Sequence, residues 1–69
     1  MYMIREIRET KGFSIKDVAA ACDIPITTLY DVETGRKGIL AKKAKKISFF
    51  LGEPLDKLFV STYYRAKIS

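Results

Sequence analysis

The stretch that decides the fold is GFSIKDVAAACDIPITTLYDVETG, residues 12–35. Its first half predicts a helix that begins at Ile15, because Ser14 and Asp17 have the spacing of a capping box, with Asp in place of the usual Glu or Gln. The apolar residues of this helix repeat at helical spacing and form one narrow face: Val18, Ala19 and Cys22. This half therefore predicts a short amphipathic helix.

The second half predicts a tight turn and another short helix. Asp23-Ile24-Pro25 ends the first helix, because Asp accepts turn conformations and Pro suits only the first turn of a helix. Leu29 and Val32 supply the buried side of the next helix, and Gly35 fits the left-handed position that closes it. Two short helices with a small apolar seam and a tight turn form a helix-turn-helix motif.

At these positions the sequence resembles the small helix-turn-helix DNA-binding proteins that include phage repressors and Cro (XRE-like proteins). Their pattern matches the following residues of this chain: Arg8, Gly12-Phe13-Ser14, Val18-Ala19, Asp23-Ile24-Pro25 and Glu33-Thr34-Gly35. The register continues without insertion to Leu58, so the resemblance covers roughly residues 3–59. It implies an all-α, compact five-helix domain of the lambda-repressor type, which we place over residues 1–60. The resemblance does not explain the C-terminal tail over residues 61–69, which is a possible dimerisation strand.

Composition agrees with a nucleic-acid partner. The 69 residues allow one domain, and 13 Lys and Arg against 8 Asp and Glu give a net charge of +5. This charge favours a polyanion, with nucleic acid first and an acidic membrane surface second. The single cysteine cannot form an internal disulfide, which fits a reducing compartment, so we expect a cytoplasmic protein. No stretch approaches the ~18 apolar residues of a membrane span.

Enzymatic readings have little support in this sequence. The chain has no histidine, which is the commonest general base and metal ligand. Cys22 falls on an apolar helix face, where core packing explains a small residue better than nucleophilic chemistry does. No His/Cys cluster has metal-ligand spacing, and no glycine-rich loop has phosphate-binding form. We therefore expect a non-enzyme with no catalytic residue, metal, cofactor or small-molecule ligand.

Three more helices are predicted, with bounds of about Tyr2 to Lys11, Leu40 to Leu51 and Pro54 to Phe59. The first of them turns Ile4 and Ile7 inward. The buried face of the second follows helical spacing: Leu40, Ala44, Ile47 and Leu51. After Phe59 the residues become β-branched and aromatic, which favours a strand.

The resemblance implies that the helix after Pro25 enters the major groove of DNA. Its exposed positions are the expected base contacts: Ile26, Thr27, Thr28, Tyr30 and Asp31. The chain has no Gln or Asn and this helix has no Arg, so the helix has no bidentate contact to adenine or guanine. Thr27 can bond a base edge or touch a thymine methyl, and Asp31 can accept from cytosine. Packing under the turn for Ile26 and a half-buried position for Thr28 are alternatives to base contact.

Other positions are expected to contact the DNA backbone or to hold the domain together. Phosphate contacts are expected from Lys16, Arg36, Lys37, Lys42 and Lys43. Ile15 stands where the family often has a glutamine that touches the backbone, so that bond is not available here. The resemblance implies a partly buried ion pair between Arg8 and Glu33 with a structural role.

Phe49 falls among lysines on its helix, where a phenylalanine favours cover from the tail or from another subunit. An extended tail leaves backbone groups unpaired, which a two-fold related strand would satisfy. We therefore expect a homodimer whose interface includes Phe49, Val60, Tyr63 and Tyr64. A tail folded back on its own subunit and a disordered tail are the competing outcomes.

The function these residues favour is sequence-specific binding of double-stranded DNA by a small transcriptional regulator. Among such regulators, a repressor of a phage, mobile-element or restriction-modification operon fits best. One alternative is an antitoxin or another protein-interaction module that uses the same fold. A cationic membrane-surface protein is disfavoured because the cations alternate with a core pattern and tryptophan is absent.

Overall fold

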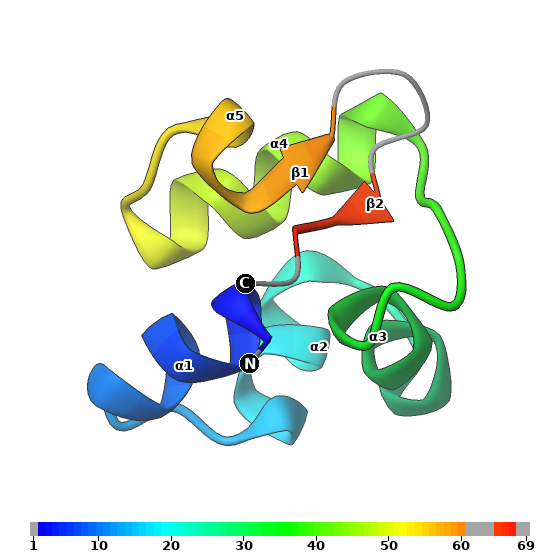
Figure 1. Cartoon of the computed structure of the whole chain (residues 1–69). Coiled ribbons are helices and arrows are strands. Elements are labelled where there is room, and N and C mark those ends of the chain that lie inside the picture. The colour runs from blue at the N-terminus through cyan, green and yellow to red at the C-terminus, as the bar shows by residue number, and fades with distance from the viewer. Residues whose placement is uncertain (1, 61–64, 68–69) are drawn as a thin grey trace.

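The computed structural model describes residues 2–60 and 65–67, which form five helices and two short strands (Figure 1). The helices are α1 (Met3–Thr10), α2 (Ile15–Cys22), α3 (Ile26–Glu33), α4 (Ala41–Leu51) and α5 (Leu55–Leu58). The strands are β1 (Phe59–Val60) and β2 (Arg65–Ala66). The predicted fold, a compact helical domain with a short strand near its C-terminus, is confirmed.

One hydrophobic core joins all five helices. Each helix contributes a fully buried apolar side chain: Ile4, Val18, Leu29, Ile47 and Leu58. Helix α2 packs against both α3 and α4, and α4 continues the packing to α5. Figure 1 shows α1, α2 and α3 on one side of the molecule and α4, α5 and β1 on the other, so the core lies between these two groups.

The start of α4 differs from the prediction. The helix begins at Ala41, and Leu40 precedes it with an extended backbone. Leu40 is 76% exposed, so its predicted place on the buried face of this helix is wrong. Helical spacing sets the direction of a side chain only while the backbone is helical. The half-buried Ile39 packs against the core from this connection instead.

The C-terminal strand is present, but it pairs within its own chain. Strands β1 and β2 are antiparallel, with Phe59 opposite Ala66, and both side chains are buried. Next to them the Lys67 N–H donates to the Leu58 carbonyl at 2.9 Å, and the Lys67 carbonyl accepts from the Met3 N–H at 3.4 Å. At these residues, therefore, the strand has its partner within the same chain, and the prediction that only a second subunit could pair it is wrong. Strand β2 also lies against α3.

Candidate nucleic-acid interface

The start of α2 is fixed by the predicted capping box. The Ser14 hydroxyl accepts from the Asp17 N–H at 3.0 Å, and the Asp17 carboxylate accepts from the Ser14 N–H at 2.8 Å. The Ser14 backbone bond, with the Ser14 side chain and Lys16 adding to it, lowers the pKa of the exposed Asp17 carboxyl. Ile15, which replaces the glutamine expected from the resemblance, is half-buried and packs against the core.

The turn between α2 and α3 is built from Asp23, Ile24 and Pro25. Asp23 adopts the left-handed conformation (φ 57°, ψ 53°) that ends α2. Ile24 is buried, and its N–H donates to the Ala19 carbonyl at 2.9 Å, so it is a core residue that the sequence reading used only as a turn residue. Pro25 is extended and directly precedes α3. These contacts fix the direction in which α3 leaves the turn.

Helix α3 separates a buried side from an exposed side. Its buried residues are Leu29, Val32 and Glu33. Of the five expected base contacts, Ile26, Thr27 and Tyr30 are exposed, whereas Thr28 and Asp31 are half-buried. Ile26, for which packing under the turn is the alternative, is 45% exposed, and Tyr30 is 48% exposed.

The end of α3 folds back toward Asp31. Gly35 has a φ of +78°, and the Arg36 N–H then donates to the Asp31 carbonyl at 2.9 Å. The ammonium of Lys37 lies 3.6 Å from the Asp31 carboxylate. This ion pair offsets the negative charge that Asp31 places on α3, which lessens its repulsion of a phosphate nearby.

Arg8 and Glu33 meet inside the protein and join α1 to the end of α3. The Arg8 Nε donates to Glu33 Oε2 at 2.8 Å, and a second Arg8 nitrogen donates to Oε1 at 3.3 Å. Arg8 also donates to the Phe13 carbonyl at 3.0 Å. Both side chains are buried, so this pair sets the orientation of α3 and does not face solvent.

A second arginine of α1, which the sequence reading passed over, reaches α3. The Arg5 guanidinium carbon lies 5.0 Å from the centre of the Tyr2 ring and 5.6 Å from that of Tyr30. Its Nε donates weakly to Glu33 at 3.5 Å. A signal was present in the sequence, because Tyr2, Arg5 and Arg8 have the i, i+3 spacing that places residues on one side of a helix.

The comparisons with known proteins agree with this arrangement. A family model described as Helix-turn-helix matches residues 4–58. The chain belongs to this XRE/Cro-type family. It is accordingly a DNA-binding transcription regulator whose partner is double-stranded DNA. No curated protein and no solved structure gives a significant match.

The basic side chains of this helix-turn-helix regulator that are expected to contact phosphates fall into two groups. Lys16, Arg36, Lys37 and Lys42 are exposed, at the start of α2, after α3 and in the first turn of α4. Lys43 differs from them, because it is half-buried and its ammonium donates to the Asp23 carbonyl at 3.0 Å, besides lying 3.5 Å from the Asp23 carboxylate. Lys43 therefore already holds the end of α2.

The residues expected at a dimer interface lie away from α3 in the sequence. Phe49 is 90% exposed on α4, and Val60 is exposed in β1. Tyr63 and Tyr64 fall outside the described residues. The two exposed apolar side chains are thus available for contact with another surface.

Within residues 2–60 and 65–67, no cluster of His, Cys, Asp and Glu could hold a metal ion. Cys22 is fully buried, and this burial raises the pKa of its thiol, against the weaker opposing effect of Lys46 and Lys43. A buried thiol with a raised pKa is a poor nucleophile. No helix in the described part of the regulator is long and apolar enough to cross a membrane.

Proposed function

We propose that this regulator is a sequence-specific repressor that binds its operator as a homodimer. The observation that carries the proposal is the division of α3, whose buried side is fixed by Leu29, Val32 and Glu33. Its opposite side exposes Ile26, Thr27 and Tyr30. A recognition helix needs this division, because its fixed side must define where the exposed side chains meet the base edges.

The exposed side chains favour a particular kind of readout. Thr27 offers a hydroxyl and a methyl group, and Ile26 offers only apolar atoms. Thymine carries the one methyl group in the major groove, so we propose that each half-site presents thymines to these two residues. Asp31 is an acceptor for a cytosine amino group, at a position where Lys37 moderates its charge.

The exposed cations supply affinity that does not depend on sequence. Lys16 lies in the first turn of α2, where the free backbone N–H groups also attract phosphate. Arg36, Lys37 and Lys42 follow α3, and we propose that they contact phosphates of the same half-site. For Lys43 to contact a phosphate as well, its ammonium must leave Asp23 when DNA binds.

A dimer suits this readout because a two-fold axis repeats a short half-site about one helical turn away. We propose that exposed apolar groups form its interface, with Phe49 and Val60 joined by Tyr63 and Tyr64. Sedimentation of the full chain at tens of micromolar tests this proposal. Phe49→Lys should shift the mass toward the monomer, whereas the control Lys45→Ala, on the same exposed face, should leave it unchanged. A monomeric full chain would contradict the dimer.

Repression is the outcome we propose for occupancy of such a site, because a bound dimer covers DNA that RNA polymerase needs. A phage, mobile-element or restriction-modification operon is the proposed setting. A reporter placed behind the selected site tests the sign of regulation, since expression should fall when the regulator is supplied. Increased expression would identify an activator instead.

Selection of bound duplexes from a random library tests the readout. Thr27→Ala should weaken binding to the selected site and leave random-DNA binding nearly unchanged. Lys42→Ala should weaken both and lower the salt slope by roughly one unit. Thr28→Ala compares the two threonines directly: Thr28 is half-buried on α3, so its loss should weaken binding to the selected site less than the loss of the exposed Thr27 does. If Thr27→Ala weakens binding to selected and random DNA equally, the proposal that α3 reads bases in the major groove is wrong.

A further inference from the structure

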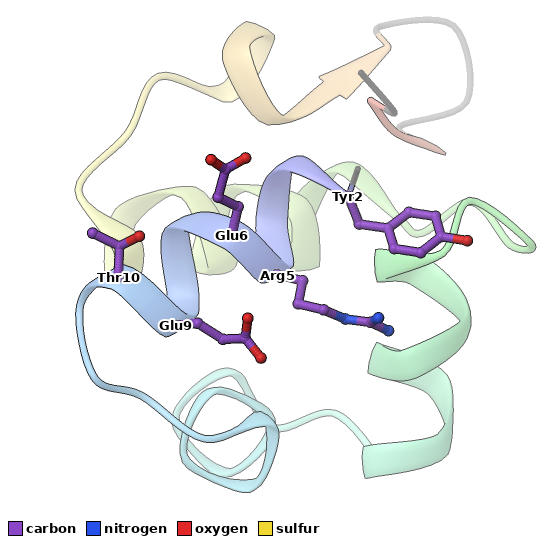
Figure 2. A pocket seen from close by; sticks show the side chains of 5 residues that line it. All are labelled: Tyr2, Arg5, Glu6, Glu9 and Thr10. Carbon is purple, nitrogen blue, oxygen red and sulfur yellow. The ribbon is translucent and has the colours of Figure 1, made fainter.

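Two aromatic rings, one just before α1 and one on α3, meet at the guanidinium of Arg5. Tyr2 precedes α1 and Tyr30 lies on α3, with ring centres 5.0 Å and 5.6 Å from the guanidinium carbon. Both distances fall within the ~6 Å range of a cation–π interaction. Figure 2 shows the Tyr2 and Arg5 side chains extending from the start of α1 toward α3. Arg5 thus connects α1 to an exposed side chain of α3.

The other end of the connection is rigid. The Arg5 Nε lies 3.5 Å from Glu33 Oε1, and this fully buried carboxylate is held more closely by Arg8 at 2.8 Å. Tyr30 is 48% exposed, whereas every group behind Arg5 in this chain of contacts is buried. The ring of Tyr30 is therefore the free end of a network that is anchored in the core.

The surroundings of Arg5 disfavour direct phosphate binding by this arginine. Tyr2 and Arg5 share an open hollow along α1 with Glu6, Glu9 and Thr10, and its two carboxylates would repel a phosphate. Glu33 already offsets part of the guanidinium charge. The contacts of Arg5 point to mechanical support of Tyr30.

We propose that Arg5, stacked on Tyr2, is a positioning residue that holds the Tyr30 ring on the flank of α3 in the orientation used to read DNA. An exposed tyrosine occupies several staggered rotamers, and binding must select one of them. The Arg5 contact selects that rotamer before DNA arrives. This inference rests on the proposed function, in which α3 reads the operator.

The first experiment needs no DNA. The χ1 rotamer of Tyr30 is measured from side-chain coupling constants in the free protein by NMR. One dominant rotamer is expected in the wild type, and rotamer averaging is expected in Arg5→Gln. Arg5→Lys should also average, because the ammonium lacks the planar group that stacks on a ring. Lys57→Gln, which removes a positive charge from α5, is the control and should leave the rotamer unchanged.

The second experiment measures binding to the selected site and to random duplex. Arg5→Gln should weaken selected-site binding by about 2- to 5-fold, the effect of losing one exposed cation–π contact. Random-DNA binding and the salt slope should stay near the wild-type values. In a Tyr30→Ala background, Arg5→Gln should have no further effect, because the ring that it positions is gone.

Three results would overturn the inference: an unchanged Tyr30 rotamer in Arg5→Gln, additive losses in the double variant, or a salt slope lowered by about one unit with equal losses on both DNAs. The last result would identify Arg5 as a phosphate contact. Absence of DNA binding by the wild type would refute the proposed function, and the rotamer measurement would still judge the Arg5 contact by itself. Thermal melting of each variant confirms that it is folded.

Discussion

Removal of the Glu33 carboxylate is the sharpest test of how α3 is held. Glu33→Ala leaves the Arg8 guanidinium in a site where its side chain is only 8% exposed, with the Phe13 carbonyl as its remaining acceptor. The two Arg8–Glu33 hydrogen bonds of 2.8 Å and 3.3 Å are lost together. The substitution therefore lowers the free energy of unfolding by more than the loss of these two hydrogen bonds alone, because it also leaves a buried charge without its counter-ion.

The expected loss is large relative to the stability of the domain. Breaking a buried ion pair on one side costs about 3–5 kcal/mol. A chain of 69 residues has a free energy of unfolding of roughly 3–10 kcal/mol, at about 0.05–0.15 kcal/mol per residue. At about 4–8 °C per kcal/mol for a domain of this size, even a 3 kcal/mol loss lowers the melting temperature by about 12–24 °C.

Thermal melting followed by circular dichroism measures this loss. Glu53→Ala is the matched control, because it removes a carboxylate from the partly exposed i, i+4 pair with Lys57 at 3.0 Å. Such a pair contributes about 0–1 kcal/mol, so the control should shift the melting temperature by only a few degrees. The double variant Arg8→Met/Glu33→Met should melt above Glu33→Ala, because it leaves no buried charge. If Glu33→Ala has the same melting temperature as the Glu53→Ala control, the Arg8–Glu33 pair does not stabilise the domain as proposed.

Three other outcomes follow from the structure. Lys43→Ala should lower the melting temperature by releasing the end of α2, whereas Lys42→Ala should leave it unchanged while weakening DNA binding; the reverse order would show that the Asp23 contact is unimportant. The lowered pKa of Asp17 means that its stabilisation is complete above its ordinary value of 3.8 and is lost as the pH falls through the folded pKa. Melting curves between pH 6 and pH 2 should therefore show a shallower acid loss for Asp17→Asn than for the wild type. Cys22 should react with a thiol reagent at neutral pH only as fast as the protein opens, and rapid labelling of the native protein would contradict its burial.

Local signals explain why the sequence predicted the central helices well. The Ser14–Asp17 capping box and the Asp23 turn act within a few residues, and both are present where the pattern placed them. Errors arise where a periodic pattern meets a helix end. Leu40 continues the spacing of α4, but its backbone is extended, so the spacing no longer determines its direction. Ile24 was missed as a core residue because turn chemistry alone does not reveal which turn side chain points inward.

The tail could not be predicted in the same way. Its composition indicated a strand, but composition does not select the pairing partner. The chain pairs β2 with β1 and places Ala66 in the core, which depends on residues that are distant in the sequence. Arg5 was overlooked for a similar reason, since its second ring, Tyr30, lies on another helix. Contacts between elements follow from the fold, and one sequence read by local pattern does not contain them.

The residues that hold α3 are different from the residues that α3 exposes. Leu29, Val32 and Glu33 tie the helix to the core, and Thr27 makes none of these buried contacts. Changes at Thr27 should therefore alter base preference with little effect on folding. Tyr30 is the exception, because Arg5 couples it to the buried Glu33. A substitution at Tyr30 should disturb both the reading surface and its support, so this position should tolerate change less well than Thr27.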